Sequence, residues 1–124
     1  MLNEAVGGEE VLASQVLTMA IEGDLDASDL GEICAELFRL AHRGHRRIVI
    51  DLGGVIHLDY RGLGPLAARA ELYRRGGGDI KLCGVSAYLF AILRAAGVQD
   101  SFDVYATAEL ARAAFSAERM QSVA

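Results

Sequence analysis

The sequence is poor in several residue types that mark particular protein classes. Its 124 residues include no tryptophan, one proline and two cysteines, and only 6% are aromatic. No apolar run approaches the ~20 residues that a membrane span needs, which argues against membrane insertion. Residues 1–4 also lack the basic start of a signal peptide. We therefore expect a single domain located in the cytoplasm.

Basic residues are too few to suggest a nucleic-acid partner. Lys and Arg number 12 against 17 Asp and Glu, which gives a formal net charge of −5. A surface that binds nucleic acid needs a basic face. One small basic cluster is present, at a position typical of a helix C-terminus, where cations offset the helix dipole. Its members are His42, Arg43, His45, Arg46 and Arg47.

Candidates for catalysis and metal binding are equally sparse. Cys34 and Cys83 lie at expected core positions without metal-ligand spacing, so we expect buried free thiols. His42 and His45 share a helix end and His57 adjoins a strand, so no Ser/His/Asp or Cys/His set emerges. We expect no enzymatic activity, no metal and no cofactor.

Apolar runs with strand character alternate with stretches of helical periodicity. This order predicts an α/β fold with a mostly parallel sheet of four or five strands and about four helices. Residues 10–13 and 16–22, separated by Ser14-Gln15, predict an antiparallel hairpin at the start of the sheet. The expected domain spans residues 10–117, with a loose lead-in over residues 1–9 and a frayed tail over residues 118–124.

The middle of the chain carries the clearest local pattern. A β-branched strand over residues 48–52 is expected to break at Gly53-Gly54, to resume at Val55 and to lead into a helix whose first turn contains Pro65. Asp59 and Tyr60 are thereby expected at a helix N-terminus, where free N–H groups and the helix dipole favour anions.

Two motifs together resemble the STAS domain of bacterial anti-sigma-factor antagonists. Gly23-Asp24-Leu25-Asp26 differs from the family's Gly-Glu-Leu-Asp at one position, and Asp59 with Gly62-Leu63-Gly64 matches a second motif of Asp-Ser-Ser or Asp-Ser-Thr followed by Gly-Leu-Gly. The resemblance extends over roughly residues 10–115. It implies a STAS-like fold and a protein partner, first of all an anti-sigma factor of the serine-kinase type.

The second motif departs from the family at its centre. The family's phosphorylated serine corresponds to Tyr60, and the next position is Arg61. A tyrosine oxygen lies too far from the backbone for an active site shaped for serine, and a phenol of pKa ~10 is neutral at pH 7. We expect Tyr60 to stay unphosphorylated and to act as an aromatic anchor. The resemblance implies a partner-binding face made of Asp26, Asp59, Tyr60, Arg61, Gly62 and Leu63.

Several alternatives stay open at this point. Loss of the serine also suits a constitutive subunit of a transporter, an ABC ATPase or a stressosome-like scaffold, and a small-ligand or nucleotide sensor is a third class. Asp26 fits a cap as well as a contact, and Arg61 fits an ion pair with Asp59 as well as an anion site. A homodimer and phosphorylation at Ser28 or Ser86 are also open.

Overall fold

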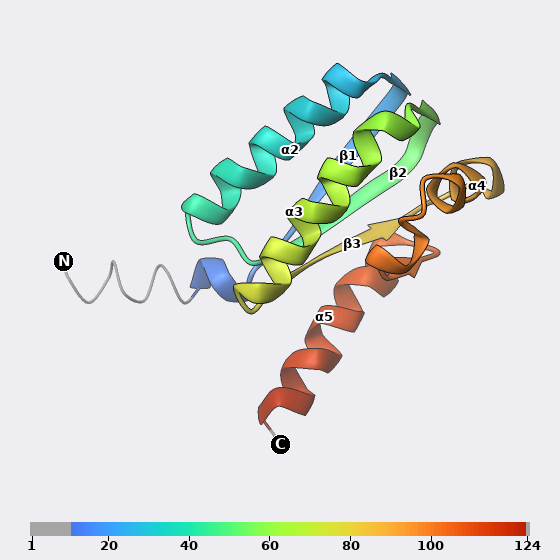
Figure 1. The fold of residues 1–124 in the computed structure, drawn as a ribbon. Coiled ribbons are helices and arrows are strands. Elements are labelled where there is room, and N and C mark those ends of the chain that lie inside the picture. The colour runs from blue at the N-terminus through green and yellow to red at the C-terminus, as the bar shows by residue number, and fades with distance from the viewer. Residues whose placement is uncertain (1–10, 124) are drawn as a thin grey trace.

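A computed structural model describes residues 11–123, with side chains described as far as residue 118. The chain forms one four-stranded sheet in the order β1-β2-β3-β4, and every neighbouring pair is parallel (Figure 1). The strands are β1 (Val16–Leu25), β2 (Arg47–Leu58), β3 (Asp79–Cys83) and β4 (Val104–Tyr105). The longer helices are α2 (Ala27–His42), α3 (Leu63–Arg75), α4 (Ala87–Ala95) and α5 (Ala108–Val123). Two 3₁₀ turns, η1 (Tyr60–Gly62) and η2 (Gln99–Ser101), precede α3 and β4.

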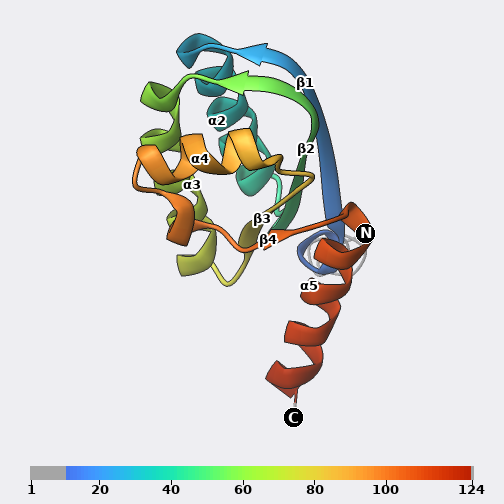
Figure 2. The same ribbon diagram turned by 90° about the vertical axis from the view of Figure 1, so that its right-hand side faces the viewer.

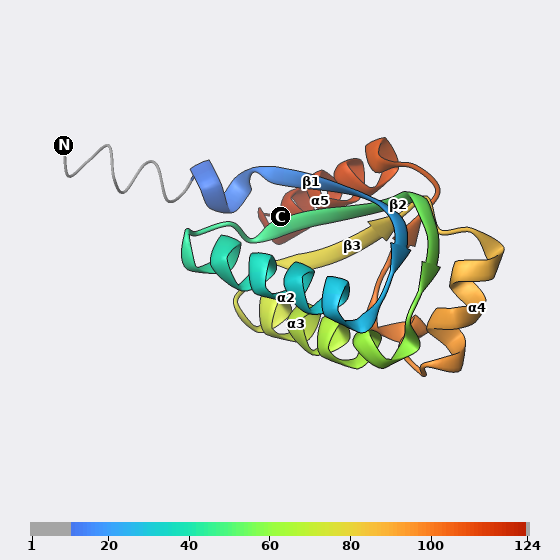
Figure 3. The same cartoon turned by 90° about the horizontal axis from the view of Figure 1, so that it is seen from above.

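The helices cover the sheet unequally. Helices α2 and α3 lie side by side on one face, and α5 lies on the other (Figure 3). Helix α4 lies at the end of the sheet near the N-terminus of α3 (Figure 2). The main core lies beneath α2 and α3, where Leu37 and Leu63 are fully buried, and a smaller cluster around Val49 and Phe115 holds α5. Among residues 11–123, no helix combines the length and apolar character needed to cross a membrane.

The predicted antiparallel hairpin is wrong for the described residues. Residues 11–14 are helical, and the amide of Gln15 donates to the carbonyl of Val11 at 2.9 Å. A short apolar run does not distinguish a strand from a helical turn, which explains the error. The described residues contain five α-helical segments, counting residues 11–14, where about four helices were expected. The predicted lead-in and residue 10 lie outside the described residues.

Strand β2 does not break at Gly53-Gly54, contrary to expectation. It is paired with β1 on both sides of this point, and two register shifts, opposite Ala20–Glu22 and opposite Gly23–Asp24, each accommodate one extra residue in β2. A Cβ on Gly54 would lie 3.0 Å from the Cβ of Glu22, so glycine allows the two strands to approach here. Both strands consequently bend together toward the helical face (Figure 3).

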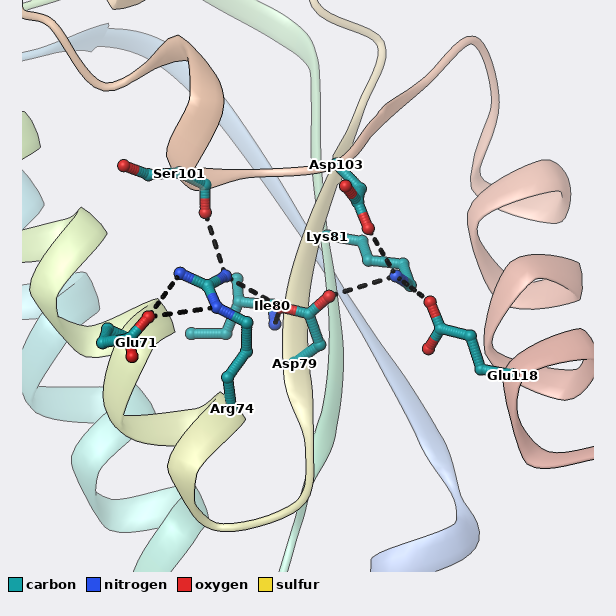
Figure 4. A network of polar contacts seen from close by, with 8 residues as sticks. All are labelled: Glu71, Arg74, Asp79, Ile80, Lys81, Ser101, Asp103 and Glu118. Atoms are coloured by element: carbon teal, nitrogen blue, oxygen red, sulfur yellow. Dashed lines mark hydrogen bonds and ion pairs between the residues drawn. The ribbon is translucent and has the colours of Figure 1, made fainter. Parts of the chain in front are cut away.

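A buried lysine ties α5 to the sheet. Lys81 in β3 has no exposed side-chain surface, and its Nζ lies 3.1 Å from Asp79 Oδ2, 3.1 Å from Asp103 Oδ2 and 2.7 Å from Glu118 Oε1 (Figure 4). Burial lowers the pKa of Lys81, but the three carboxylates raise it more, so its pKa lies above the ordinary value. The ammonium also lies 4.8 Å from the ring centre of Phe115.

The predicted domain limit at residue 117 stays a prediction. In the structure α5 continues to Val123, and Glu118 belongs to the Lys81 network.

Candidate protein-binding site

The parallel register of β1 and β2 brings the two sequence motifs together. Leu25 pairs with Leu58 at the carboxyl ends of the two strands. Asp26 follows the first strand and Asp59 follows the second, and the amide of Asp59 donates to the carbonyl of Leu25 at 2.9 Å. The two aspartates therefore begin neighbouring helical segments at one end of the sheet.

Asp26 is the N-cap of α2. Its Oδ1 accepts from the amide of Asp29 at 2.8 Å, and the Asp29 carboxylate accepts from the amide of Asp26 at 3.0 Å, forming a capping box. Such a cap satisfies helix N–H groups that otherwise lack partners. Asp26 remains exposed, so this structural role leaves its carboxylate accessible.

Asp59 and Arg61 form a local ion pair around the start of η1. Nη2 of Arg61 lies 2.6 Å from Oδ2 of Asp59, while Nε and the backbone amide of Arg61 each lie 3.0 Å from Oδ1. Side-chain hydrogen bonding from Arg61, then its backbone hydrogen bond, lowers the pKa of Asp59 to about 2. Of the two roles considered for Arg61, the structure contains the ion pair, and the Arg61 side chain is otherwise 71% exposed.

Tyr60 points into solvent between these two charged residues. Its exposed fraction is 63%, and the phenol has no hydrogen-bond partner among residues 11–118. Position 60 thus presents an aromatic ring at the surface. A buried phenol would have excluded any contact role for this residue.

Gly62 and Leu63 shape the site from beneath. Leu63 is fully buried. Gly62 packs on α2, where an added Cβ would lie 2.6 Å from Leu30 Cδ1. These two residues hold η1 and α3 close to α2, and neither offers an exposed side chain for a partner to contact.

A hollow of about 740 Å³ separates η1 from α4 and was not anticipated from the sequence. Tyr60 and Arg61 line one side, and Tyr88 of α4 lines the other. The Tyr88 hydroxyl lies 2.6 Å from Nδ1 of His57, which connects α4 to the end of β2. Tyr88 is 56% exposed, so the hollow is flanked by two accessible tyrosines.

The two other candidate hydroxyls have different environments. Ser86 caps α4, because its Oγ accepts from the amide of Leu89 at 3.1 Å. Ser28 is exposed in the first turn of α2, close in sequence to Asp26. Phosphorylation of either serine stays an open alternative.

One group of carboxylates within the described residues has a spacing suited to a metal ion. Oxygens of Asp79, Asp103 and Glu118 lie within 4.8 Å of one another. Lys81 Nζ donates to all three, so the ammonium already supplies the positive charge that this group attracts.

Cys34 and Cys83 are buried free thiols, and burial is the main reason that the pKa of each is raised.

Comparison with known proteins assigns the fold and the family. Residues 11–111 match the STAS domain family model. The proposed anti-sigma factor antagonist BtrV of Bordetella bronchiseptica is 27% identical over 100 residues, which cover 81% of this chain and 86% of BtrV.

Solved structures share this fold. The anti-sigma factor antagonist SpoIIAA in its unphosphorylated form has a TM-score of 0.63 at 16% identity, covering 87% of this chain and 91% of SpoIIAA. A sulfate transporter family protein from Wolinella succinogenes has a TM-score of 0.64 at 19% identity, covering 82% of this chain and 84% of its own. The parallel sheet, its helices and the matched residues therefore place this chain in the STAS domain family, with distant similarity to anti-sigma factor antagonists.

Proposed function

We propose that this chain is a non-enzymatic regulatory module that docks a kinase-type anti-sigma factor or a related partner-switching regulator. The docking face consists of the surface around Asp26, Asp59, Tyr60 and Arg61. In this proposal, position 60 recognises the partner without being phosphorylated. Gly62 and Leu63 act by holding this surface in place.

The observation that carries the proposal is the exposed ring of Tyr60 beside an open hollow. Tyr60 is 63% exposed and lines the hollow together with Tyr88, which is 56% exposed. Tyrosines are enriched among the residues that dominate binding energy at protein interfaces. The ion pair between Asp59 and Arg61 neutralises much of the charge next to this ring, which favours an aromatic contact over charge recognition.

Binding measurements with the purified full chain test the proposal. A kinase-type anti-sigma factor from the same organism serves as the partner, and calorimetry gives its affinity. Tyr60→Ala is expected to weaken docking by ~2 kcal/mol, or about 30-fold. Leu110→Ala is the control, because Leu110 is 53% exposed on α5, away from the hollow. A change within ~0.5 kcal/mol for Tyr60→Ala would remove Tyr60 from the interface.

Incubation with the same kinase and ATP tests the second half of the proposal. The mass of the wild-type chain should stay unchanged. A stoichiometric phosphate on Tyr60 would contradict it, because the site would then be chemically switched.

Binding measurements with an ABC-type ATPase beside the kinase separate the proposal from a constitutive role in a transporter or scaffold. Retention of an ABC-type ATPase from the same operon, together with no affinity for any kinase-type anti-sigma factor, would replace the proposed function with that alternative. Binding of the kinase through Tyr60 would reject the alternative.

A further inference from the structure

The C-terminal ends of α2 and α3 enclose a second hollow, far along both helices from Tyr60. Its volume is about 230 Å³. Helix α2, the loop before β2 and helix α3 each contribute to its lining. The lining residues that matter for recognition are Phe38, His42, His45, Arg46, Arg69 and Leu72.

This hollow concentrates basic side chains in an acidic protein. The sequence already groups His42, His45 and Arg46 at the end of a helix, and α3 adds Arg69 from a distant part of the chain. None of these four residues forms an ion pair with a carboxylate of the described residues. A local positive field of this kind attracts anions although the whole chain carries a formal charge of −5.

Two nitrogen atoms at the hollow lack the partners that buried polar atoms normally have. Nε of Arg69 and Nδ1 of His45 are both buried without a hydrogen bond. The guanidinium of Arg69 has no hydrogen-bond acceptor at all among residues 11–118. Leaving a buried donor unsatisfied is costly, and such atoms usually have a functional or ligand-related explanation.

The apolar part of the hollow is also organised around Arg69. Its guanidinium carbon lies 5.2 Å from the ring centre of Phe38, within the range of a cation–π contact. Phe38 and Leu72 remain 50% and 51% exposed, so they offer a flat apolar surface beside the cationic groups.

Arg46 compensates the negative end of the α2 dipole. Its Nη1 donates to the carbonyl of Ala41 at 2.9 Å and to that of His45 at 3.2 Å. These carbonyls would otherwise repel an anion in the hollow. With Arg46 in this position, the guanidinium of Arg69 supplies the charge that attracts a ligand to the hollow.

We propose that this hollow is a binding site for a small organic anion. Its oxyanion group, a phosphate monoester or a carboxylate, accepts hydrogen bonds from the terminal nitrogens of the Arg69 guanidinium, while its flat apolar body packs on Phe38 and Leu72. The volume is below the ~300 Å³ at which sites for drug-sized ligands begin, so the ligand is smaller than a dinucleotide. The site is separate from the proposed docking face, and either proposal can fail without the other.

Titration of the full chain with four probes, followed by NMR and calorimetry, tests this inference. Phenyl phosphate and benzoate supply the two anionic groups on a flat body, inorganic phosphate lacks the body, and benzyl alcohol lacks the charge. We expect phenyl phosphate or benzoate to bind about tenfold tighter than either incomplete probe. The shifted amide signals should belong to the C-terminal halves of α2 and α3. The tighter of the two anions identifies the head group.

A matched pair of variants separates recognition from nonspecific attraction. Arg69→Met should weaken binding of the better anion by about tenfold or more, because it removes the unpaired donors. Arg94→Met is the control, since Arg94 lies 5.3 Å from the ring centre of Phe90 on α4 and makes the same kind of stack elsewhere. This control should leave the affinity within about twofold.

Arg69→Lys provides a second variant if Arg69→Met fails to fold. It keeps the charge but loses the planar donors, and we expect weaker binding of the better anion. Absence of binding by both organic anions would overturn the inference. So would equal binding of benzyl alcohol, signal changes confined to residues around Tyr60, or unchanged affinity in a folded Arg69 variant.

Discussion

Gly62 lies directly against Leu30, at the contact where α3 begins and α2 passes beneath it. A Cβ on Gly62 would fall 2.6 Å from Leu30 Cδ1 and 2.8 Å from its Cβ, and Leu30 is only 1% exposed. The second atom is bound to the backbone of α2, so rotation of the Leu30 side chain cannot clear it. The spacing of the two helices below the docking face therefore depends on glycine at position 62.

Gly62→Ala is expected to destabilise the fold by about 1 to 3 kcal/mol, because overpacking at this contact must displace α2 or α3. Gly64→Ala is the control, since an added Cβ there has no atom within 4 Å and lies in the first turn of α3. We expect that control to be neutral or stabilising by up to ~1 kcal/mol. Urea unfolding of both variants measures the difference, and equal stability of the two would contradict the role assigned to Gly62.

The ion pair between Asp59 and Arg61 leads us to expect that the stability of the fold depends on pH in the acidic range. The pKa of Asp59 is lowered to about 2 in the folded chain, against ~3.9 for an unperturbed aspartate. Because the pKa of Asp59 is lower in the folded chain than in the unfolded chain, its ionised carboxylate stabilises the fold at pH values above ~3.9. This contribution is lost as the pH falls toward 2. NMR titration of the Asp59 carboxyl carbon should show a midpoint near the lowered value.

The matched variants for this titration are Arg61→Ala and Arg75→Ala. Arg61→Ala should return the Asp59 midpoint toward the ordinary range, because the hydrogen-bonding side chain is gone. Arg75 pairs with Glu71 near the C-terminal end of α3, so its removal should leave Asp59 unchanged. If the Asp59 midpoint does not change in Arg61→Ala, the ion pair does not determine the pKa of Asp59.

Sequence patterns predict the parts of this site that depend on neighbouring residues in the chain. Asp26 and Asp59 are identified because their motifs resemble those of the STAS family, and Asp59 also because it lies between an expected strand and a helix N-terminus. The helix cap at Asp26 follows from residue type. Both inferences depend on neighbours in sequence.

The features missed from the sequence are contacts between distant residues. The bond between His57 and Tyr88 spans 31 positions, and the stack of Arg69 on Phe38 joins two different helices. No periodicity encodes such partners. The predicted break at Gly53-Gly54 in β2 was wrong for a related reason. Glycine permits the close approach of two strands as readily as a strand break, and only the position of Glu22 on β1 distinguishes the two.

We expect replacement of the buried Lys81 to lower the stability of the protein strongly, with the largest local effect in α5. Lys81→Met removes the ammonium shared by Asp79, Asp103 and Glu118 and should lower the free energy of unfolding by about 2 to 4 kcal/mol. The loss is smaller than for a fully enclosed pair, because the side chains of Asp103 and Glu118 are 60% and 49% exposed. Hydrogen exchange should accelerate most in α5.

Arg75→Met serves as the control for Lys81→Met. The pair between Arg75 and Glu71 spans 3.6 Å at the surface, and its loss should cost less than ~1 kcal/mol. Because the folded-state pKa of Lys81 lies above its ordinary value, its contribution should be present at neutral pH and be lost only as the pH rises above about 10. Similar unfolding free energies for the two variants would show that α5 is held by its apolar contacts alone.

Replacing Tyr60 with serine tests whether the rest of the site still supports phosphorylation. Position 60 begins η1 between Asp59 and Arg61 and is well exposed, so a serine hydroxyl there is reachable by a kinase that docks on this face. On the proposed function, Tyr60→Ser should accept one phosphate per chain from the kinase-type anti-sigma factor, whereas the wild type and Tyr60→Ala accept none.

The added phosphate carries ~1.5 to 2 negative charges beside the carboxylates of Asp26 and Asp59, and repulsion between these groups should loosen the complex. Mass spectrometry locates the phosphate, and calorimetry before and after phosphorylation gives the change in affinity. A phosphate on Ser28 or Ser86 would move the regulatory site away from position 60. A Tyr60→Ser chain that binds the kinase yet stays unmodified would mean that the bulk of tyrosine is not what prevents phosphorylation here, because the small hydroxyl would then be present and still unused.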